Sequence, residues 1–173
     1  MSPRPTATGD RPEPASLVEM LLRLEAQEQR GLVFIHGANQ EDRVPYARLL
    51  ADARHMLTRL RARGLKPGQE LVVQTGDNRA LLTIFWACAL GGLVPAPLAP
   101  ARQAENRRKL WGVWPRLTRP WLAVDAAHWD HLLQHDPAET AAIAGRVIFV
   151  DELWADLQRG EQVRSQVAPP PQA

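Results

Sequence analysis

Residues 64–100 read GLKPGQELVVQTGDNRALLTIFWACALGGLVPAPLAP, and this stretch decides the fold class. After a glycine- and proline-rich turn, the apolar run Leu71–Val73 is typical of a strand that is covered on both faces of a parallel sheet. Asp77 or Asn78 can cap the helix that follows, which is apolar nearly all round and therefore internal. A glycine pair ends this helix, and Leu93–Ala96 is predicted to return as a strand. The stretch thus predicts a βαβ unit with a right-handed crossover.

A helix and a hairpin are predicted ahead of this stretch. Ser16 and Glu19 occupy the N-cap and N3 positions of a capping box, and apolar residues then recur at helical spacing. This helix is expected to end near Gly31. The β-prone run Leu32–Ile35, a turn-rich segment and a second extended piece around residues 43–44 together predict a short N-terminal hairpin.

The next helix has the clearest periodicity in the chain. It opens at Val44–Tyr46 and is expected to stop at Gly64, because glycine suits the left-handed position that follows a helix. Its predicted buried stripe consists of Leu49, Leu50, Ala53, Met56, Leu57 and Leu60. Four polar residues are expected to lie off this stripe: Arg48, Asp52, Arg59 and Arg63.

Helices and strands continue to alternate in the second half of the chain. The predicted elements are a polar helix over Gln103–Trp114, a strand over Trp121–Val124, a helix from Asp125, a strand over Val147–Val150, and a last helix from Asp151 that fades near Gly160. Strands that alternate with helices predict an α/β fold with parallel-type strands.

Three parts are expected along the chain. Residues 1–14 are proline-rich and lack the apolar region of a signal peptide, so they are predicted to be a disordered leader. Residues 15–158 hold the predicted helices and strands and form one domain. Residues 159–173 are polar and end in a proline run, which predicts a tail or linker.

The charge of the chain gives little reason to expect a nucleic-acid partner. The formal net charge is only +2 over 173 residues, and Lys66 and Lys109 are the only lysines. Arg59, Arg61 and Arg63 fall at the end of a predicted helix, where cations complement the helix dipole. They are therefore interpreted as a solvated helix end and not as a phosphate-contacting stripe.

No membrane segment or export signal is predicted either. Residues 80–101 lack charge and approach the length of a membrane span, but the glycine pair and Pro95, Pro97 and Pro100 interrupt them. Cys88 is the only cysteine, so it forms no internal disulfide and is expected to be a small buried side chain. A cytoplasmic location follows as the expectation.

Several residue patterns suggest a site, and each also has a structural interpretation. His128, His131 and His135 share one helical face and could suit zinc, but a polar outer face is the favoured interpretation because no cysteine accompanies them. Asp151 and Glu152 are adjacent and point in different directions, so they are interpreted as the acidic start of a helix and not as a catalytic pair.

The aromatic and hydroxyl residues give no stronger signal. Trp111, Trp114 and Trp121 could stack nucleobases, but without interleaved basic residues they are expected to be core and subdomain-contact residues. Ser16, Thr83 and Ser165 lack the neighbours of a catalytic nucleophile. His36 and His55 are too isolated to assign. The sequence therefore gives no catalytic, cofactor-binding or metal-binding residue.

Four segments occur in an order and spacing that a known family shares: YARLL at 46–50, LRARGLKPG at 60–68, Asn78, and FWACALGGLVPAP at 85–97. Together they resemble the N-terminal part of the adenylate-forming (AMP-binding) superfamily, which includes acyl-CoA synthetases, fatty acyl-AMP ligases and nonribosomal peptide adenylation domains. The resemblance covers Ser16–Leu157. Residues 109–114 and 119–122 look most like the adenylation domains of polyketide and peptide assembly lines.

The resemblance implies an ATP-dependent ligase. Members of the family make an acyl- or aminoacyl-adenylate from a carboxylic acid and Mg-ATP, and usually pass the acyl group to coenzyme A or to a carrier-protein phosphopantetheine. Residues 15–158 would then be the incomplete first subdomain of the adenylate-forming fold.

The family's nucleotide-binding motifs do not occur in the chain. It lacks the Ser/Thr/Gly-rich loop that ends in lysine, and the turn Gly64–Gly68 is not followed by Lys-Ser/Thr as a P-loop would be. The expectation is therefore an N-terminal segment of such a ligase, truncated and inactive alone, whose partner is the remainder of the adenylation domain or a companion synthase subunit. The alternative is a non-catalytic module that binds a companion ligase or synthase polypeptide.

Overall fold

The computed structural model of this chain describes residues 14–27, 29–36 and 40–167. The predicted leader falls almost wholly on residues 1–13, and the proline run falls on 168–173, so both lie outside the described residues. The elements follow in the order α1 (Leu17–Glu25), β1 (Gly31–Ile35), β2 (Glu41–Pro45), α2 (Tyr46–Ala62), β3 (Glu70–Gln74), α3 (Asn78–Gly91), β4 (Val94–Pro97), α4 (Ala104–Val113), a 3₁₀ turn (Trp114–Arg116), β5 (Trp121–Val124), α5 (Ala126–His135), α6 (Pro137–Ile143), a second 3₁₀ turn (Ala144–Arg146), β6 (Val147–Phe149) and α7 (Val150–Val167).

The centre of the molecule is a four-stranded parallel sheet in the order β4-β3-β5-β6. The predicted βαβ unit is confirmed, since β3, α3 and β4 follow one another and Leu71 lies beside Pro95 in the parallel pair. Asp77 is the N-cap of α3 and accepts hydrogen bonds from the backbone N–H groups of Arg79 and Ala80. The α/β class with a separate antiparallel hairpin is therefore as the sequence predicts.

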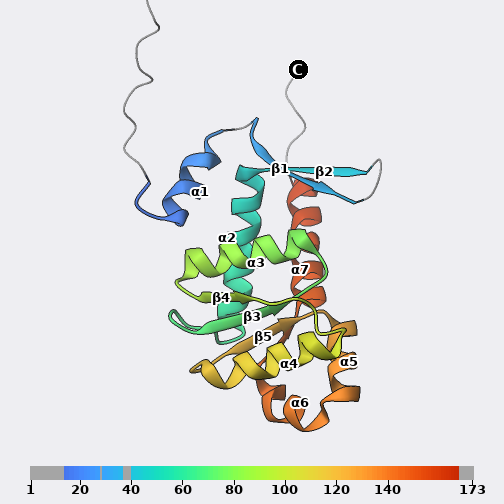
Figure 1. The fold of residues 1–173 in the computed structure, drawn as a ribbon. Coiled ribbons are helices and arrows are strands. Elements are labelled where there is room, and N and C mark those ends of the chain that lie inside the picture. Colours follow the sequence, from blue (N-terminus) through green and yellow to red (C-terminus); the bar gives the residue numbers. More distant parts are fainter. Residues whose placement is uncertain (1–13, 28, 37–39, 168–173) are drawn as a thin grey trace, which may run out of the picture.

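Helices cover both faces of this sheet, which gives three layers (Figure 1). Alternate strand residues face opposite layers, so Leu71 and Val73 pack with α2, α3 and α7, while Val72 and Leu122 pack with α4, α5 and α6. The stripe of α2 that the sequence predicts is buried throughout, including Leu50 and Met56, which are fully enclosed.

The hairpin β1–β2 is antiparallel and packs on α1 and on the first turns of α2. The prediction that the first helix reaches Gly31 is wrong, because α1 ends at Glu25 and Gly31 begins β1. A Cβ at Gly31 would lie only 2.3 Å from the carbonyl oxygen of Val44, so glycine is required there for the close approach of β2 and not as a helix stop. The capping box is half formed, since the Ser16 hydroxyl accepts from the Glu19 N–H while the Glu19 carboxylate accepts from Ala15.

Two glycines end helices as the sequence predicts. Gly64 follows α2 with φ of +102°, and Gly92 follows α3 with φ of +67°, conformations that a Cβ disfavours. The second stop falls inside the uncharged segment 80–101. Accordingly, none of the helices in the described ranges has the length and apolarity needed to cross a membrane.

The last third of the chain departs from the prediction in two places. The helix α6 was not predicted; Pro137 stops α5 but also starts α6, because proline fits the first turn of a helix. The last helix does not fade near Gly160, because α7 continues to Val167. Gly160 lies well inside α7, where a glycine weakens a helix but does not end it.

Cys88 gives a direct test of the packing around α3. Its side chain is fully buried, and burial raises the pKa of the thiol to about 12. We therefore expect Cys88 to react with iodoacetamide at pH 8 at least about a hundredfold more slowly in the native protein than in denaturant, because little thiolate forms and the sulfur is enclosed. Mass spectrometry of the alkylated protein measures this. Equal rates in both states would contradict the packing.

Candidate functional site

The carboxyl ends of the parallel strands form the edge at which α/β sheets commonly bind ligands. Here they carry Thr75 and Asp77 after β3, Asp125 after β5, and Asp151 after β6. These residues line a hollow of about 190 Å³ that Trp154 of α7 also borders. This edge is the first place where a functional site is to be sought.

The carboxylates of this edge hold the backbone of neighbouring connections. Asp77 caps α3, as described above. Asp125 Oδ2 accepts a hydrogen bond from the Gly76 N–H at 2.8 Å, and Asp151 Oδ2 accepts one from the Ala126 N–H at 2.6 Å. Asp125 therefore ties the loop after β5 to the loop after β3, and Asp151 ties the start of α7 to the start of α5. An edge lined with acids that already accept backbone N–H groups is poorly suited to a triphosphate.

His128 joins this edge to the loop that follows β4. Its side chain is only 4% exposed, and its Nδ1 lies 3.0 Å from Asp125 Oδ2. Arg102 Nε donates a hydrogen bond of 2.7 Å to His128 Nε2. Because arginine can only donate, His128 Nε2 is the acceptor of this hydrogen bond.

The three histidines of α5 therefore do not form one site. His128 is buried against Asp125, which contradicts the predicted polar outer face at this position. His131 and His135 lie further along the helix with ring centroids 4.1 Å apart, and His131 contacts Arg107. Across the described residues, no three His, Cys, Asp or Glu side chains are grouped so that they could hold a metal ion.

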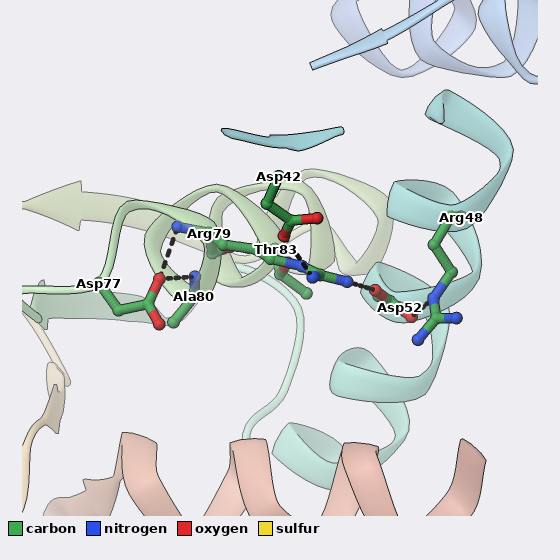
Figure 2. Close-up of polar contacts among 7 residues, drawn as sticks. All are labelled: Asp42, Arg48, Asp52, Asp77, Arg79, Ala80 and Thr83. Atoms are coloured by element: carbon green, nitrogen blue, oxygen red, sulfur yellow. Dashed lines mark hydrogen bonds and ion pairs between the residues drawn. The ribbon is translucent and has the colours of Figure 1, made fainter. Parts of the chain in front are cut away.

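A second polar cluster lies between the hairpin and the helices α2 and α3 (Figure 2). Arg79 of α3 donates from Nη1 to Asp42 Oδ2 at 2.9 Å and from Nη2 to Asp52 Oδ2 at 3.4 Å. Arg48 Nε donates to the other oxygen of Asp52 at 2.7 Å. We call Asp42, Arg48, Asp52 and Arg79 the Arg79 cluster.

The Arg79 cluster connects four elements. It joins β2, α2 and α3 through the contacts above, and the Arg79 guanidinium also lies 5.6 Å from the ring centroid of Trp154 in α7. Asp52 is 3% exposed, although the sequence places it off the buried stripe of α2, so that expectation is wrong. The sequence gives one indication that Asp52 is paired: Arg48 lies four residues earlier, and oppositely charged residues at this spacing pair on a helix.

A larger groove runs beside the hairpin. Its volume is about 870 Å³, and its walls are β1 with His36 on one side and the start of α3 on the other. The α3 wall consists of Gly76, Asp77, Asn78, Leu81 and Leu82. The groove is therefore lined by both apolar and polar residues.

No family model matches the chain. Several solved structures match it. An adenylation and carrier-protein unit of McyG, complexed with phenylalanyl-adenylate, is 28% identical over 83% of this chain with a TM-score of 0.71. The adenylation domain of a keto acid-selecting nonribosomal peptide synthetase module, bound to keto acyl adenylate, is 33% identical over 77% with a TM-score of 0.61. A fatty acid AMP ligase from Legionella pneumophila shares the fold at 20% identity, with a TM-score of 0.65 over 85% of this chain.

The chain has the fold of part of the adenylate-forming superfamily. The resemblance that the sequence motifs indicate is thereby confirmed, including the likeness to nonribosomal peptide adenylation domains. The chain spans 26% of the McyG structure and 25% of the fatty acid AMP ligase structure, so it corresponds to about a quarter of an adenylate-forming domain of that kind.

Within this part of the adenylate-forming fold, the other residues considered in the sequence have structural roles. Arg63 pairs with Glu152 at 2.9 Å and Arg59 lies 3.8 Å from Asp156, so these arginines join α2 to α7 instead of forming a free cationic stripe. The three tryptophans are half-buried and pack against the core clusters: Trp111 and Trp114 against the layer of α4, α5 and α6, and Trp121 against the layer of α2, α3 and α7.

The Arg79 cluster can be tested by one substitution. Asp52→Asn leaves two arginines without their buried carboxylate, and we expect it to lower the free energy of unfolding by about 2 kcal/mol. Glu25→Gln is the control, because it removes the exposed pair with Arg54 and should cost less than about 1 kcal/mol. Urea unfolding followed by circular dichroism measures both. Equal losses would show that the cluster does not stabilise the fold more than a surface pair does.

Proposed function

We propose that this chain forms the N-terminal scaffold of an ATP-dependent ligase that activates a carboxylic acid as its acyl- or aminoacyl-adenylate. The observation that carries the proposal is the 28–33% identity, over about four fifths of the chain, to adenylation domains that are bound to adenylates. Those neighbours also support a place in a polyketide or peptide assembly line. ATP and magnesium would be its cofactors, and coenzyme A or a phosphopantetheine would accept the acyl group.

In this proposal the chain supplies support and not catalytic groups. Attack of a carboxylate on the α-phosphate requires cations and N–H donors aimed at the developing negative charge. The sheet edge of this chain presents Asp77, Asp125 and Asp151 instead, and each of them already accepts a backbone N–H. The triphosphate-binding groups would come from the remainder of the adenylation domain, and the chain alone would be inactive. A single buried thiol suits the cytoplasm as its location.

A second function is favoured by one specific observation. The groove beside β1 is bordered by apolar side chains that are open to solvent, among them Val33 and Ile35. A surface of this kind suits an interaction module that binds a companion ligase or synthase polypeptide without taking part in adenylate formation.

A chimera distinguishes these two functions. Residues 15–158 would replace the matching segment of the keto acid-selecting adenylation domain, and pyrophosphate exchange into ATP would be measured with its keto acid. If the chain is a ligase scaffold, exchange should remain within about tenfold of the parent, a loss of about 1.4 kcal/mol in transition-state stabilisation.

Two controls define the result. The full chain alone and the recipient lacking the segment should give no exchange. A folded, monomeric chimera without exchange would contradict the ligase scaffold and favour the interaction module. Exchange by the full chain alone would contradict the claim that it lacks the nucleotide-binding groups.

A further inference from the structure

The outer edge of β1 is an unpaired strand edge. Among the described residues this sheet has two strands, and the hydrogen bonds between them show which backbone groups each strand turns outward. His36 N–H donates to Gln40, and Tyr46 N–H donates to Arg30, so these are hydrogen-bonded pairs at the two ends of the ladder. In an antiparallel ladder, hydrogen-bonded and non-hydrogen-bonded pairs alternate.

This alternation fixes the direction of each residue of β1. Leu32 and Phe34 form hydrogen-bonded pairs with β2, so the N–H and C=O groups of Val33 and Ile35 point away from it. No partner within the described ranges of the chain satisfies these outward groups. Val33 and Ile35 are also 49% and 73% exposed, so apolar side chains accompany the open backbone.

The groove lies along this same edge. Leu32, Val33, Phe34, Ile35 and His36 all line it, although side chains of successive strand residues point to opposite faces. A cavity that touches five consecutive residues therefore borders the edge of the strand and not one of its faces. Its opposite wall is the start of α3, where Leu81 and Leu82 provide an apolar floor.

The two edges of the hairpin differ in their protection. Proteins commonly protect open strand edges with charged residues and proline. β2 carries Glu41, Asp42, Arg43 and Pro45, whereas β1 reads GLVFI and has neither charge nor proline. The β2 edge is therefore protected against pairing, and the β1 edge is suited to it.

We propose that an extended strand of the polypeptide that completes the ligase domain pairs with the outer edge of β1 and fills the groove beside α3. This inference rests on the proposed function. The occupant is assigned to that polypeptide because the match covers only 26% and 25% of two similar structures, so most of each lies outside the part that this chain matches. An added strand would also supply partners for Val33 and Ile35 at once. Its apolar residues, at alternate positions, would lie on Leu81 and Leu82.

Hydrogen–deuterium exchange on the full chain tests the proposal. The probe is the keto acid-selecting adenylation domain expressed without the segment that matches this chain. In the chain alone, the amide of Phe34 should be protected by the hairpin, while those of Val33 and Ile35 exchange freely. On mixing, the amides of Val33 and Ile35 should become at least about tenfold protected.

A pair of proline variants tests the direction of pairing. Ile35→Pro removes an outward N–H of β1 without removing a hairpin hydrogen bond, so it should weaken binding of the probe about tenfold. Glu41→Pro is the matched control, because Glu41 is the register partner of Ile35 and its N–H points to the far edge of β2. It should leave binding within about twofold.

Three results would overturn the proposal. The first is protection of the Val33 and Ile35 amides in the chain alone, whether by the chain itself or by a second copy. The second is binding of the probe without added protection of these amides, or with an equal loss of affinity in both proline variants. The third is that the probe does not bind the chain at all. The covalent chimera tests the proposed function separately. If the chimera exchanges pyrophosphate while the β1 amides remain unprotected, the ligase-scaffold proposal stands and the strand-pairing proposal is wrong.

Discussion

Arg79 places one guanidinium between two carboxylates, and the arrangement of the first half of the chain depends on that contact. Asp52 is almost fully enclosed, and a buried carboxylate without a partner is strongly destabilising. The contact between Asp52 of α2 and Arg79 of α3 therefore fixes where α3 lies on α2. The same guanidinium holds β2 through Asp42 and lies over Trp154 of α7, so four elements that are distant in sequence are positioned by one side chain.

The same principle extends to the carboxyl edge of the sheet. Asp77, Asp125 and Asp151 each accept a hydrogen bond from a backbone N–H, and Asp125 also faces the buried ring of His128. Charges that could have received a ligand instead stabilise the loops between strands and helices. The result is an α/β unit whose sheet-edge acids are occupied by backbone N–H groups, beside a hairpin whose β1 edge carries neither charge nor proline.

Local patterns were enough to predict the elements that their own residues determine. The unit from β3 to β4 follows from an apolar run, the cap at Asp77 and the glycine stop after α3, and the buried stripe of α2 follows from its helical period. Asp52 and His128 could not be predicted in this way, because their burial depends on Arg79 and Arg102, which come from other elements. At the sheet edge, Asp125 and Asp151 accept backbone N–H groups from other loops, contacts that no local pattern in the sequence shows.

The Arg79 cluster positions α2, α3 and β2 because its charged side chains bind one another. A double-mutant cycle on Asp52→Asn and Arg79→Gln tests it most directly, because it isolates the energy that the two side chains share. Unfolding in urea of the parent, the two single variants and the double variant should give a coupling of about 1–3 kcal/mol. Additive effects, with a coupling below about 0.5 kcal/mol, would contradict the account.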